Sequence, residues 1–206
     1  MFNRKCKITF ISHGSTVFSE ENRITDKLDY PPLNDNGYEE MNKIVQFIKK
    51  RGLKTDNIYC SPQLCCVQSA EILADELKQD FKILTELTNR KCGEWSGLTF
   101  DKIEKSHPEM LKNLQYNPMD CCPKNGEKIE DFNTRVNSVI EQIINENLRG
   151  RVIVVTSPSI IQSAIKNALD FSPKAQYRIY IKNASATQIS YFTDWASLVY
   201  SDYTPL

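Results

Sequence analysis

The sequence predicts a single α/β domain with three layers, in which helices cover both faces of a doubly wound, mostly parallel sheet. Three observations predict this fold class. Short apolar runs alternate with longer amphipathic segments along the whole chain. The most apolar run, at 152–156, has the composition of a strand that is buried on both faces. No repeat, low-complexity tract or Gly/Ser linker divides the chain, so residues 1–206 are expected to form one domain.

The predicted strands are short runs that are rich in β-branched and aromatic residues. The two runs nearest the C-terminus are expected to close the sheet, with an antiparallel arrangement open to them. The six runs are 7–11, 57–60, 81–84, 152–156, 177–181 and 187–192.

The predicted helices are recognised by apolar residues at helical spacing and by residues that begin or end a helix. Asn34 suits the N-cap of the first long helix, and Gly52 suits the stop after it. Ser61 and Pro62 suit the N-cap and first position of the next helix. The longer helices are expected at about 34–51, 61–78, 127–148 and 159–169.

The charge of the chain excludes several classes of partner. Its 206 residues include 26 Lys or Arg and 26 Asp or Glu, so the formal net charge is zero. A neutral chain has no long-range field that would attract nucleic acid or an anionic membrane, and neither is expected as a partner. The first residues lack the apolar stretch of a secretory signal, and no run is long enough to span a membrane. A cytoplasmic location is therefore expected.

Seven cysteines, an odd number without regular spacing, favour reduced thiols over a disulfide framework. Two adjacent pairs, Cys65-Cys66 and Cys121-Cys122, raise the alternative of a metal site. Zinc ligands are usually spaced about two to four residues apart, so that both side chains turn inward. We therefore expect no metal and no cofactor, and a structural metal is the minor alternative.

Small polar turns follow two of the predicted parallel strands. The first strand ends at Ser12-His13-Gly14, and the strand at 152–156 is followed by Ser157. In doubly wound sheets, ligands bind outside the carboxyl ends of the strands. We therefore expect a ligand site at these turns.

Six segments carry short motifs that follow one another in the order and with the spacing of a known family. They are ISHGST at 11–16, PLNDNG at 32–37, YCSPQLCCVQSA at 59–70, LTNRKCGEWSGL at 87–98, NGE at 125–127 with Asp131 and Arg135, and VIVVTSPSIIQ at 152–162. Through these segments, which extend over nearly the whole chain, the sequence resembles the histidine phosphatase superfamily, also called phosphoglycerate mutase-like. The resemblance implies the phosphoglycerate mutase-like form of the three-layer α/β/α fold.

The resemblance also implies a phosphoryl transfer in which His13 is the nucleophile. The transferring group carries negative charge, so the family surrounds it with two arginines and a second histidine, and a glutamate protonates the leaving oxygen. Here Ser12 and Cys65 stand at the arginine positions, Asn89 at the glutamate position and Ser157 at the second histidine position. Losing one charge-stabilising donor typically costs about 10²- to 10³-fold in rate. The sequence therefore predicts an intact frame around a degenerate reactive site.

Two functional hypotheses follow from this comparison. In the first, the protein is a pseudophosphatase whose phosphoryl transfer is lost or severely impaired, and it acts by binding a small molecule or a protein. In the alternative, it is an atypical, metal-independent phosphomonoester phosphatase that forms a phosphohistidine at His13. Its remaining pocket contributors would then be Gly14, Arg90, Lys91 and Glu127. A mutase is disfavoured, because rebinding a phosphorylated product requires more positive charge than this pocket offers.

The sequence leaves two further alternatives open. Cys65 could act as a thiol nucleophile with His13 as its base, which is the minor reading because an active cysteine needs a nearby base or cation. The chain could be a monomer or a homodimer, and no sequence feature decides between them.

Overall fold

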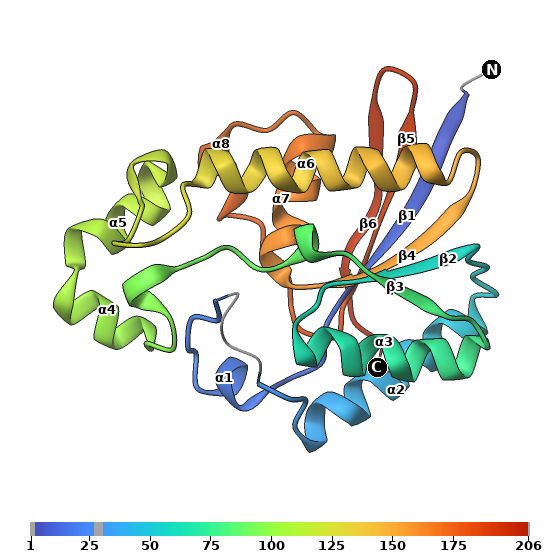
Figure 1. Ribbon diagram of the computed structural model, residues 1–206, viewed down its shortest axis with the longest axis horizontal. Helices are drawn as coiled ribbons and strands as arrows, with labels where there is room; N and C mark the ends of the chain where they lie inside the picture. The colour runs from blue at the N-terminus through green and yellow to red at the C-terminus, as the bar shows by residue number, and fades with distance from the viewer. Residues whose placement is uncertain (1–2, 27–30, 206) are drawn as a thin grey trace.

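The computed structural model describes residues 3–26 and 31–205. Its strands are β1 (Arg4–Ser12), β2 (Asn57–Cys60), β3 (Phe81–Ile83), β4 (Arg151–Thr156), β5 (Ala186–Phe192) and β6 (Ala196–Tyr203). They form a six-stranded sheet with the order β3-β2-β4-β1-β5-β6 (Figure 1). Strands β1 to β4 are parallel, whereas β5 is antiparallel to β1 and to β6. The predicted α/β class with a mostly parallel sheet is confirmed.

Helices cover both faces of this sheet. The α-helices are α1 (Val17–Glu20), α2 (Asp35–Lys50), α3 (Leu64–Leu77), α4 (Phe100–Ser106), α5 (Pro108–Tyr116), α6 (Ile129–Glu146), α7 (Pro158–Ala168) and α8 (Pro173–Gln176), and the 3₁₀ turns are η1 (Thr85–Leu87), η2 (Gly93–Trp95) and η3 (Pro118–Asp120). Helices α2 and α3 pack on one face, and α6 and α7 pack on the other (Figure 1). No helix in the described ranges is both long and apolar enough to cross a membrane.

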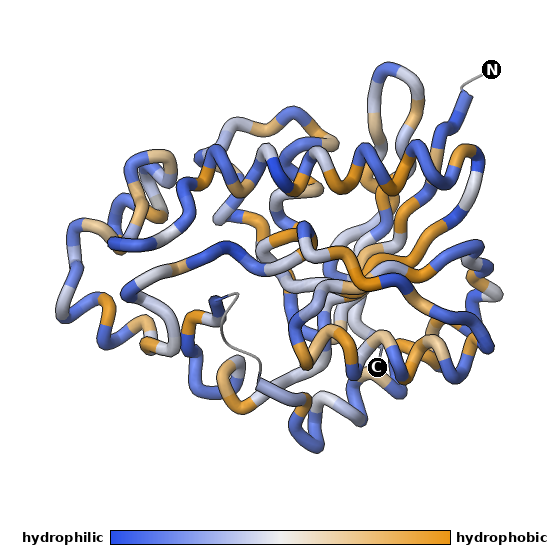
Figure 2. Tube along the Cα trace, in the orientation of Figure 1, coloured by the Kyte–Doolittle hydropathy of each residue, from blue (hydrophilic) through white to orange (hydrophobic). Residues whose placement is uncertain are grey.

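Adjacent residues of the central strands contribute to two different cores. Phe10 and Val154 belong to the core beneath α6 and α7, whereas Ile11 and Val155 belong to the core beneath α2 and α3. Successive side chains of a strand point to opposite faces, so a strand covered on both faces must be apolar throughout. Figure 2 shows this concentration of apolar residues on the central strands.

A third, small core lies away from the sheet. Trp95, Ile103 and Cys121 form it, and all three residues are buried. Helices α4 and α5 pack on each other, and α5 also packs on η3. This part of the chain projects from the body of the molecule at the left of Figure 1.

The predicted strand at 177–181 is wrong. Ile179 and Ile181 are more buried than Arg178 and Tyr180, so the side chains alternate as they would in a strand. The backbone, however, bonds locally after α8 and to a side chain of α7, since the Gln162 amide donates to the Ile179 carbonyl at 2.6 Å. Strand β5 pairs with β1 on one side, and its antiparallel neighbour on the other side is β6, which was not predicted.

One predicted helix start is confirmed and another is wrong. The Asn34 side chain accepts a hydrogen bond from the Gly37 N–H at 2.9 Å and caps α2. Ser61 caps no helix, because its N–H continues the ladder of β2 by donating to the Val155 carbonyl at 3.0 Å. Helix α3 begins only at Leu64, without a side-chain cap.

Candidate functional site

The carboxyl ends of β1 and β4 lie side by side, because the parallel register sets Ser12 opposite Thr156. His13 follows directly, and its backbone is held from two sides. Its N–H donates to the Thr156 carbonyl at 3.0 Å, and its carbonyl accepts from the Ala184 N–H at 2.9 Å. The residue is only 7% exposed. His13 is therefore fixed at the edge of the sheet where doubly wound folds bind ligands.

One ring nitrogen of His13 bonds to its own turn. Nδ1 lies 2.8 Å from the carbonyl oxygen of Gly14. A carbonyl oxygen can only accept a hydrogen bond, so Nδ1 carries a proton. Nε2 is therefore the nitrogen that remains for a partner in front of the ring.

The turn after His13 is packed closely against the first turn of α2. A Cβ at Gly14 would lie 2.5 Å from the Gly37 carbonyl oxygen, and a Cβ at Gly37 would lie 2.2 Å from the Ser15 carbonyl oxygen. Ser15 also bonds to α2, because its N–H and its hydroxyl donate to the Glu40 carboxylate at 2.8 and 2.9 Å. Two glycines thus permit the close approach that holds the His13 turn in position.

Cys65, in the first turn of α3, is connected to this turn through Ser69. The Gly14 N–H donates to the Ser69 hydroxyl at 3.2 Å, and that hydroxyl donates to the Cys65 carbonyl at 2.7 Å. Cys65 is 2% exposed. The structure therefore brings His13 and Cys65 together across about fifty residues of sequence, at the helix N-terminus where backbone N–H groups favour negative charge.

The charges of Cys65 and His13 shift each other's pKa values in opposite directions. The pKa of the Cys65 thiol is lowered, chiefly by a hydrogen bond from Cys66 and, against the effect of burial, by the charge and hydrogen bond of His13. Burial by itself would lower the pKa of His13, but the Cys65 thiolate, the Gly14 carbonyl and Glu40 outweigh burial and raise it. Both shifts favour the charged forms, the thiolate of Cys65 and the imidazolium of His13.

The other cysteines near this pair do not add a metal site. Burial raises the pKa values of the Cys60 and Cys66 thiols, so both stay protonated at neutral pH. All seven cysteines lie in the described ranges, and none forms a disulfide. Among the described residues, no group of three or more His, Cys, Asp or Glu side chains could hold a metal ion.

Asn89 and Ser157 lie together in a network of neutral groups. The Asn89 Oδ1 accepts hydrogen bonds from the Ser157 hydroxyl at 3.4 Å and from the Ser159 hydroxyl, and its Nδ2 donates to the Thr25 carbonyl at 2.9 Å. The two serine hydroxyls are 3.0 Å apart. The positions of the family's acid and second histidine thus meet here, but they hold an amide and a hydroxyl.

Ser12 adds no charge on the other side of His13. It is fully buried, and its N–H donates to the Ser185 carbonyl at 3.0 Å. Its hydroxyl has no hydrogen-bond partner in the part of the chain that the structure describes. The position is therefore enclosed, and a small neutral side chain fills it.

The Arg90 guanidinium contacts residues that come before α6 in the chain and one residue that follows α8. Nε donates to the Glu127 carbonyl at 2.9 Å, Nη2 donates to the Cys121 carbonyl at 2.7 Å, and Nη1 lies 3.4 Å from the Tyr177 hydroxyl. Three of the donors of the guanidinium are therefore bound to protein groups, and they connect three separate segments.

Glu127 and Lys91 are connected to each other and to Arg135. The Glu127 carboxylate accepts hydrogen bonds from Arg135 Nε at 3.0 Å and Nη2 at 2.8 Å, and from the Lys91 N–H at 3.2 Å. The Lys91 ammonium forms no ion pair among the described residues. Of the sequence-predicted pocket contributors, Lys91 is therefore the cation whose head group stays unpaired.

The electrostatic surroundings of His13 are negative. The charged groups that most shift its pKa are Cys65 and Glu40, both of them acidic. No Lys or Arg of the described residues is among the groups that shift this pKa most. Negative neighbours of this kind oppose the binding of an anion beside the ring.

Two contributors to this site were not singled out from the sequence. Ser69 lies four residues after Cys65 in α3, so helical spacing could have identified it as a neighbour of Cys65. Glu40 looks in the sequence like any solvent-facing charge of α2, and only the fold shows that it binds Ser15.

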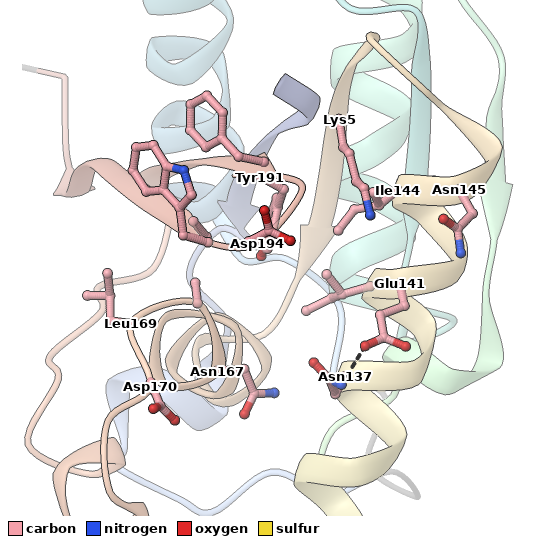
Figure 3. Close-up of a pocket in the computed structure, with 15 residues that line it drawn as sticks. Lys5, Asn137, Glu141, Ile144, Asn145, Asn167, Leu169, Asp170, Tyr191 and Asp194 are labelled. Atoms are coloured by element: carbon pink, nitrogen blue, oxygen red, sulfur yellow. Dashed lines mark hydrogen bonds between the residues drawn. The ribbon is translucent and has the colours of Figure 1, made fainter. Parts of the chain in front are cut away.

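A separate pocket of about 820 Å³ lies near the start of β1 (Figure 3). Its walls come from α6, the end of α7 and the turn between β5 and β6. Lys5 lines this pocket, and the eight residue steps of extended chain from Lys5 to His13 span about 26 Å. The two sites are therefore distinct.

The lining of this pocket combines unpaired polar groups with acidic charge. The Asn167 Nδ2 and the Tyr191 hydroxyl are buried and have no hydrogen-bond partner among the described residues. The Trp195 ring stacks on Phe192 with 4.2 Å between centroids and an interplanar angle of 5°. The carboxylates of the lining, which outnumber its lysine, are Glu141, Asp170 and Asp194.

A sequence model of the histidine phosphatase superfamily (branch 1) matches residues 8–202. Phosphoglycerate mutase-like protein 4 of Arabidopsis thaliana is 26% identical over 205 residues, which cover 97% of this chain and 86% of that protein. A bifunctional protein of Mycobacterium tuberculosis is 26% identical over 94% of this chain, which spans only 52% of its length. A solved structure of mutant phosphoserine phosphatase from Entamoeba histolytica, in complex with phosphoserine, has a TM-score of 0.84 at 20% identity over 96% of both chains. This last likeness concerns the fold.

Proposed function

Because the chain belongs to the histidine phosphatase superfamily, branch 1, we propose that it is a pseudophosphatase, which keeps the frame of the family and acts by binding. Its phosphoryl transfer is lost or severely impaired. Its partner is a small molecule or another protein, since a net charge of zero gives no attraction to nucleic acid or to a membrane surface. The cytoplasm is the proposed location.

The observation that carries this proposal is the lack of positive charge around His13. Ser12, Cys65 and Ser157 replace the cations expected from the family resemblance, and the groups that shift the His13 pKa most are acidic. Arg90, a candidate replacement, has its guanidinium bound to two carbonyls and a phenol. Without preorganised cations, the developing charge of a phosphoryl transition state is not stabilised.

The protonation state of His13 supports the same conclusion. Nδ1 donates to the Gly14 carbonyl, and the raised pKa of His13 favours a second proton on Nε2. A doubly protonated imidazole has no lone pair with which to attack phosphorus. The pairing with Cys65 therefore opposes nucleophilic catalysis by the same ring that the family uses.

The pocket in Figure 3 supports binding as the remaining activity. Its volume of about 820 Å³ is in the range of small-molecule sites. Glu141, Asp170 and Asp194 in its lining are exposed and can accept hydrogen bonds from a ligand. The excess of carboxylates favours a neutral or cationic ligand over an anion.

A hydrolysis assay and a melting experiment test the loss of phosphoryl transfer. We expect p-nitrophenyl phosphate hydrolysis no faster than that of the His13→Asn variant, and no rise in melting temperature with phosphate or vanadate. Turnover that disappears when His13 is replaced would overturn the proposal. Stabilisation by vanadate, lost in the same variant, would also contradict it.

A fluorescence titration tests the pocket. Trp195 is one of two tryptophans in the chain, so Trp95→Phe leaves it as the single reporter. With arginine methyl ester as the probe, we expect a saturable change in emission that weakens in Glu141→Gln and Asp194→Asn. A change that never saturates, or that ignores both substitutions, would speak against ligand binding at this place.

One observation favours the second candidate, an atypical metal-independent phosphatase. The Nδ1–Gly14 hydrogen bond orients the ring and leaves Nε2 as its reacting atom, which is the arrangement that a phosphohistidine requires. Lys91, whose ammonium is unpaired among the described residues, is the cation that could approach it. Incubation with a phosphomonoester, followed by denaturation at alkaline pH where the N–P bond survives, separates the candidates, because a phosphohistidine at residue 13 appears only if this one is correct.

A further inference from the structure

We propose that a basic pocket, at the end of the sheet opposite to His13, binds a compact anion of the diphosphate class. Four cationic side chains line this pocket and come from three parts of the chain. They are Lys7 of β1, Arg51 and Lys54 from the segment after α2, and Arg151 at the start of β4. This inference adds a second ligand site to the molecule and does not depend on the pseudophosphatase proposal.

The basic pocket is separate from the two sites described above. It has a volume of about 220 Å³, and its lining includes Ile153, which belongs to the core beneath α2 and α3. The pocket of Figure 3 is lined by Ile140 and Ile144 of the core on the opposite face, so the sheet separates the two pockets. Six residue steps of extended chain from Lys7 to His13 span about 20 Å. The basic pocket is therefore also distant from the His13 turn.

Two of the four cations lie opposite each other on neighbouring strands. The parallel register of β1 and β4 pairs Lys7 with Arg151, and both side chains line the same pocket. Like charges in this arrangement repel each other. The lowered pKa of Lys7 agrees with this geometry, because burial, Arg4 and Arg151 all disfavour its charged form. An anion bound between the strands would replace this repulsion with attraction.

The protein supplies no counter-ion to this pocket. None of the four cations forms an ion pair in the parts of the chain that the structure describes. No Asp or Glu of the described residues lines the pocket. Asp56 lies in the same connection as Lys54, but its carboxylate accepts a hydrogen bond from the Arg151 N–H at 2.8 Å and is not part of the lining. The positive charge of the pocket is therefore left for a ligand.

The rest of the lining holds Arg51 in place and adds no opposing charge. The Arg51 guanidinium lies 5.7 Å from the ring centroid of Phe47 and 5.9 Å from that of Tyr203. A guanidinium that is held by aromatic rings keeps the N–H donors at its edge for an oxyanion. Gln188 and Thr9, both buried, form a neutral polar wall in which the Gln188 amide donates to the Thr9 hydroxyl at 2.9 Å.

The number of cations and the size of the pocket select a small anion of high charge. Lysine and arginine form charge-assisted hydrogen bonds with phosphate oxygens, and arginine can bind two oxygens at once. A single phosphate or vanadate reaches only some of the four cations. A diphosphate carries more charge and more acceptor oxygens, so it can contact cations from β1, β4 and the segment after α2 together.

Isothermal titration calorimetry with inorganic diphosphate, in metal-depleted buffer at physiological ionic strength, tests the inference on the whole chain. We expect one saturable site whose affinity falls as sodium chloride is added, because salt screens the attraction. Orthophosphate should bind at least tenfold more weakly. Equal affinities for the two anions would contradict the assignment to the diphosphate class.

Variants of the lining locate the site. Lys7→Met and Arg151→Gln should each weaken diphosphate binding at least tenfold, because each removes a charged donor. Lys54→Gln, at an exposed position, should weaken it in the same direction without risk to folding. Lys105→Gln in α4 removes the same charge at an exposed position outside the pocket, and it should change the affinity less than twofold.

Three results would overturn the inference. The first is the absence of saturable binding, including the case in which the protein is retained on phosphatidylserine vesicles but does not bind diphosphate. The second is an equal loss of affinity in Lys105→Gln and in the lining variants. The third is loss of binding in His13→Asn, which would place the anion at the His13 turn. Loss in the lining variants leaves the pseudophosphatase proposal untouched, so the two proposals fail on different variants.

Discussion

Arg135 binds Glu127 through both carboxylate oxygens, with Nε 3.0 Å from Oε1 and Nη2 2.8 Å from Oε2. Its Nη1 also donates to the carbonyls of Glu86 and Thr88 at 2.6 and 3.0 Å. One side chain therefore connects α6 to the segment that carries Asn89. Bidentate geometry with partial burial makes such a pair more valuable than an ordinary surface ion pair.

Arg135→Met is expected to lower the free energy of unfolding by about 2 kcal/mol, since it leaves a carboxylate and two carbonyls without their donor. Urea denaturation measures this loss. Arg135→Lys should fall between Met and the wild type, because lysine keeps the charge without the fork of donors. Lys43→Ala, at an exposed position of α2, is the control and should change stability by less than about 0.5 kcal/mol. Equal losses for Arg135→Met and Lys43→Ala would contradict the structural role of the pair.

Gly37→Ala is expected to destabilise the protein by about 3 kcal/mol, because the added Cβ would meet the Ser15 carbonyl oxygen at 2.2 Å. Thermal or urea unfolding reports the change. Gly52→Asn is the matched control, since a Cβ there meets nothing within 4 Å and asparagine tolerates the positive φ of 57°. A Gly37→Ala variant as stable as Gly52→Asn would show that the turn after β1 is not held closely against α2.

The pKa shifts of His13 and Cys65 make the stability of the folded protein fall toward acidic pH. The pKa of His13 is raised from 6.5 to about 9, so its contribution is complete below pH 6.5 and is lost as pH rises through 9. The pKa of Cys65 is lowered from 9.0 to about 4, so its contribution is complete above pH 9 and is lost as pH falls through 4. Between about pH 6.5 and 9 the two changes oppose each other. Below pH 6.5 only the Cys65 contribution changes, and it decreases.

The double variant His13→Asn/Cys65→Ser removes both titrations. We expect the stability advantage of the wild type over this variant to stay level between about pH 6.5 and 9, and to shrink between about pH 6.5 and 4. Urea unfolding at several pH values gives the difference. An advantage that holds constant down to about pH 4.5 would show that the folded protein contains no thiolate–imidazolium pair.

Restoring the charges tests whether the frame is still able to bind phosphate. The variant carries Ser12→Arg, Cys65→Arg, Asn89→Glu and Ser157→His. We expect vanadate to raise its melting temperature, while the wild type shows no rise, because bidentate arginine contacts supply the missing affinity for an oxyanion. Circular dichroism first establishes that the variant folds, since all four positions are buried. A folded variant that vanadate leaves unchanged would contradict the idea that only charge is missing.

Most of the fold could be predicted because its signals are local. The central strand is apolar at each position from 152 to 155, and Asn34 marks the start of α2 with its own side chain. Strand β6 was missed because it is an edge strand of mostly half-buried and exposed residues, which gives little periodic signal. The strand predicted at 177–181 is wrong for a different reason. The side chains there alternate as in a strand, but the backbone N–H groups form hydrogen bonds with residues just before them in the chain.

The positions of the candidate site could be predicted, but their interactions could not. Motif order alone singles out His13, Cys65, Asn89 and Ser157. The pairing of His13 with Cys65 depends on where β1 and α3 are set by the sheet, and no sequence pattern encodes that distance. The same holds for Arg90, whose guanidinium is held by carbonyl groups and a phenol that come from separate segments.

The small core of Trp95, Ile103 and Cys121 gives the projecting segment its own local stability. Helices α4 and α5 can unfold transiently while the sheet and the helices that cover it remain intact, since three buried side chains cost far less to expose than two full cores. Their amide protons should therefore exchange with deuterium through partial opening, whereas those of α6 and β4 should exchange only when the whole molecule unfolds. The fold therefore consists of two cooperative units of unequal strength.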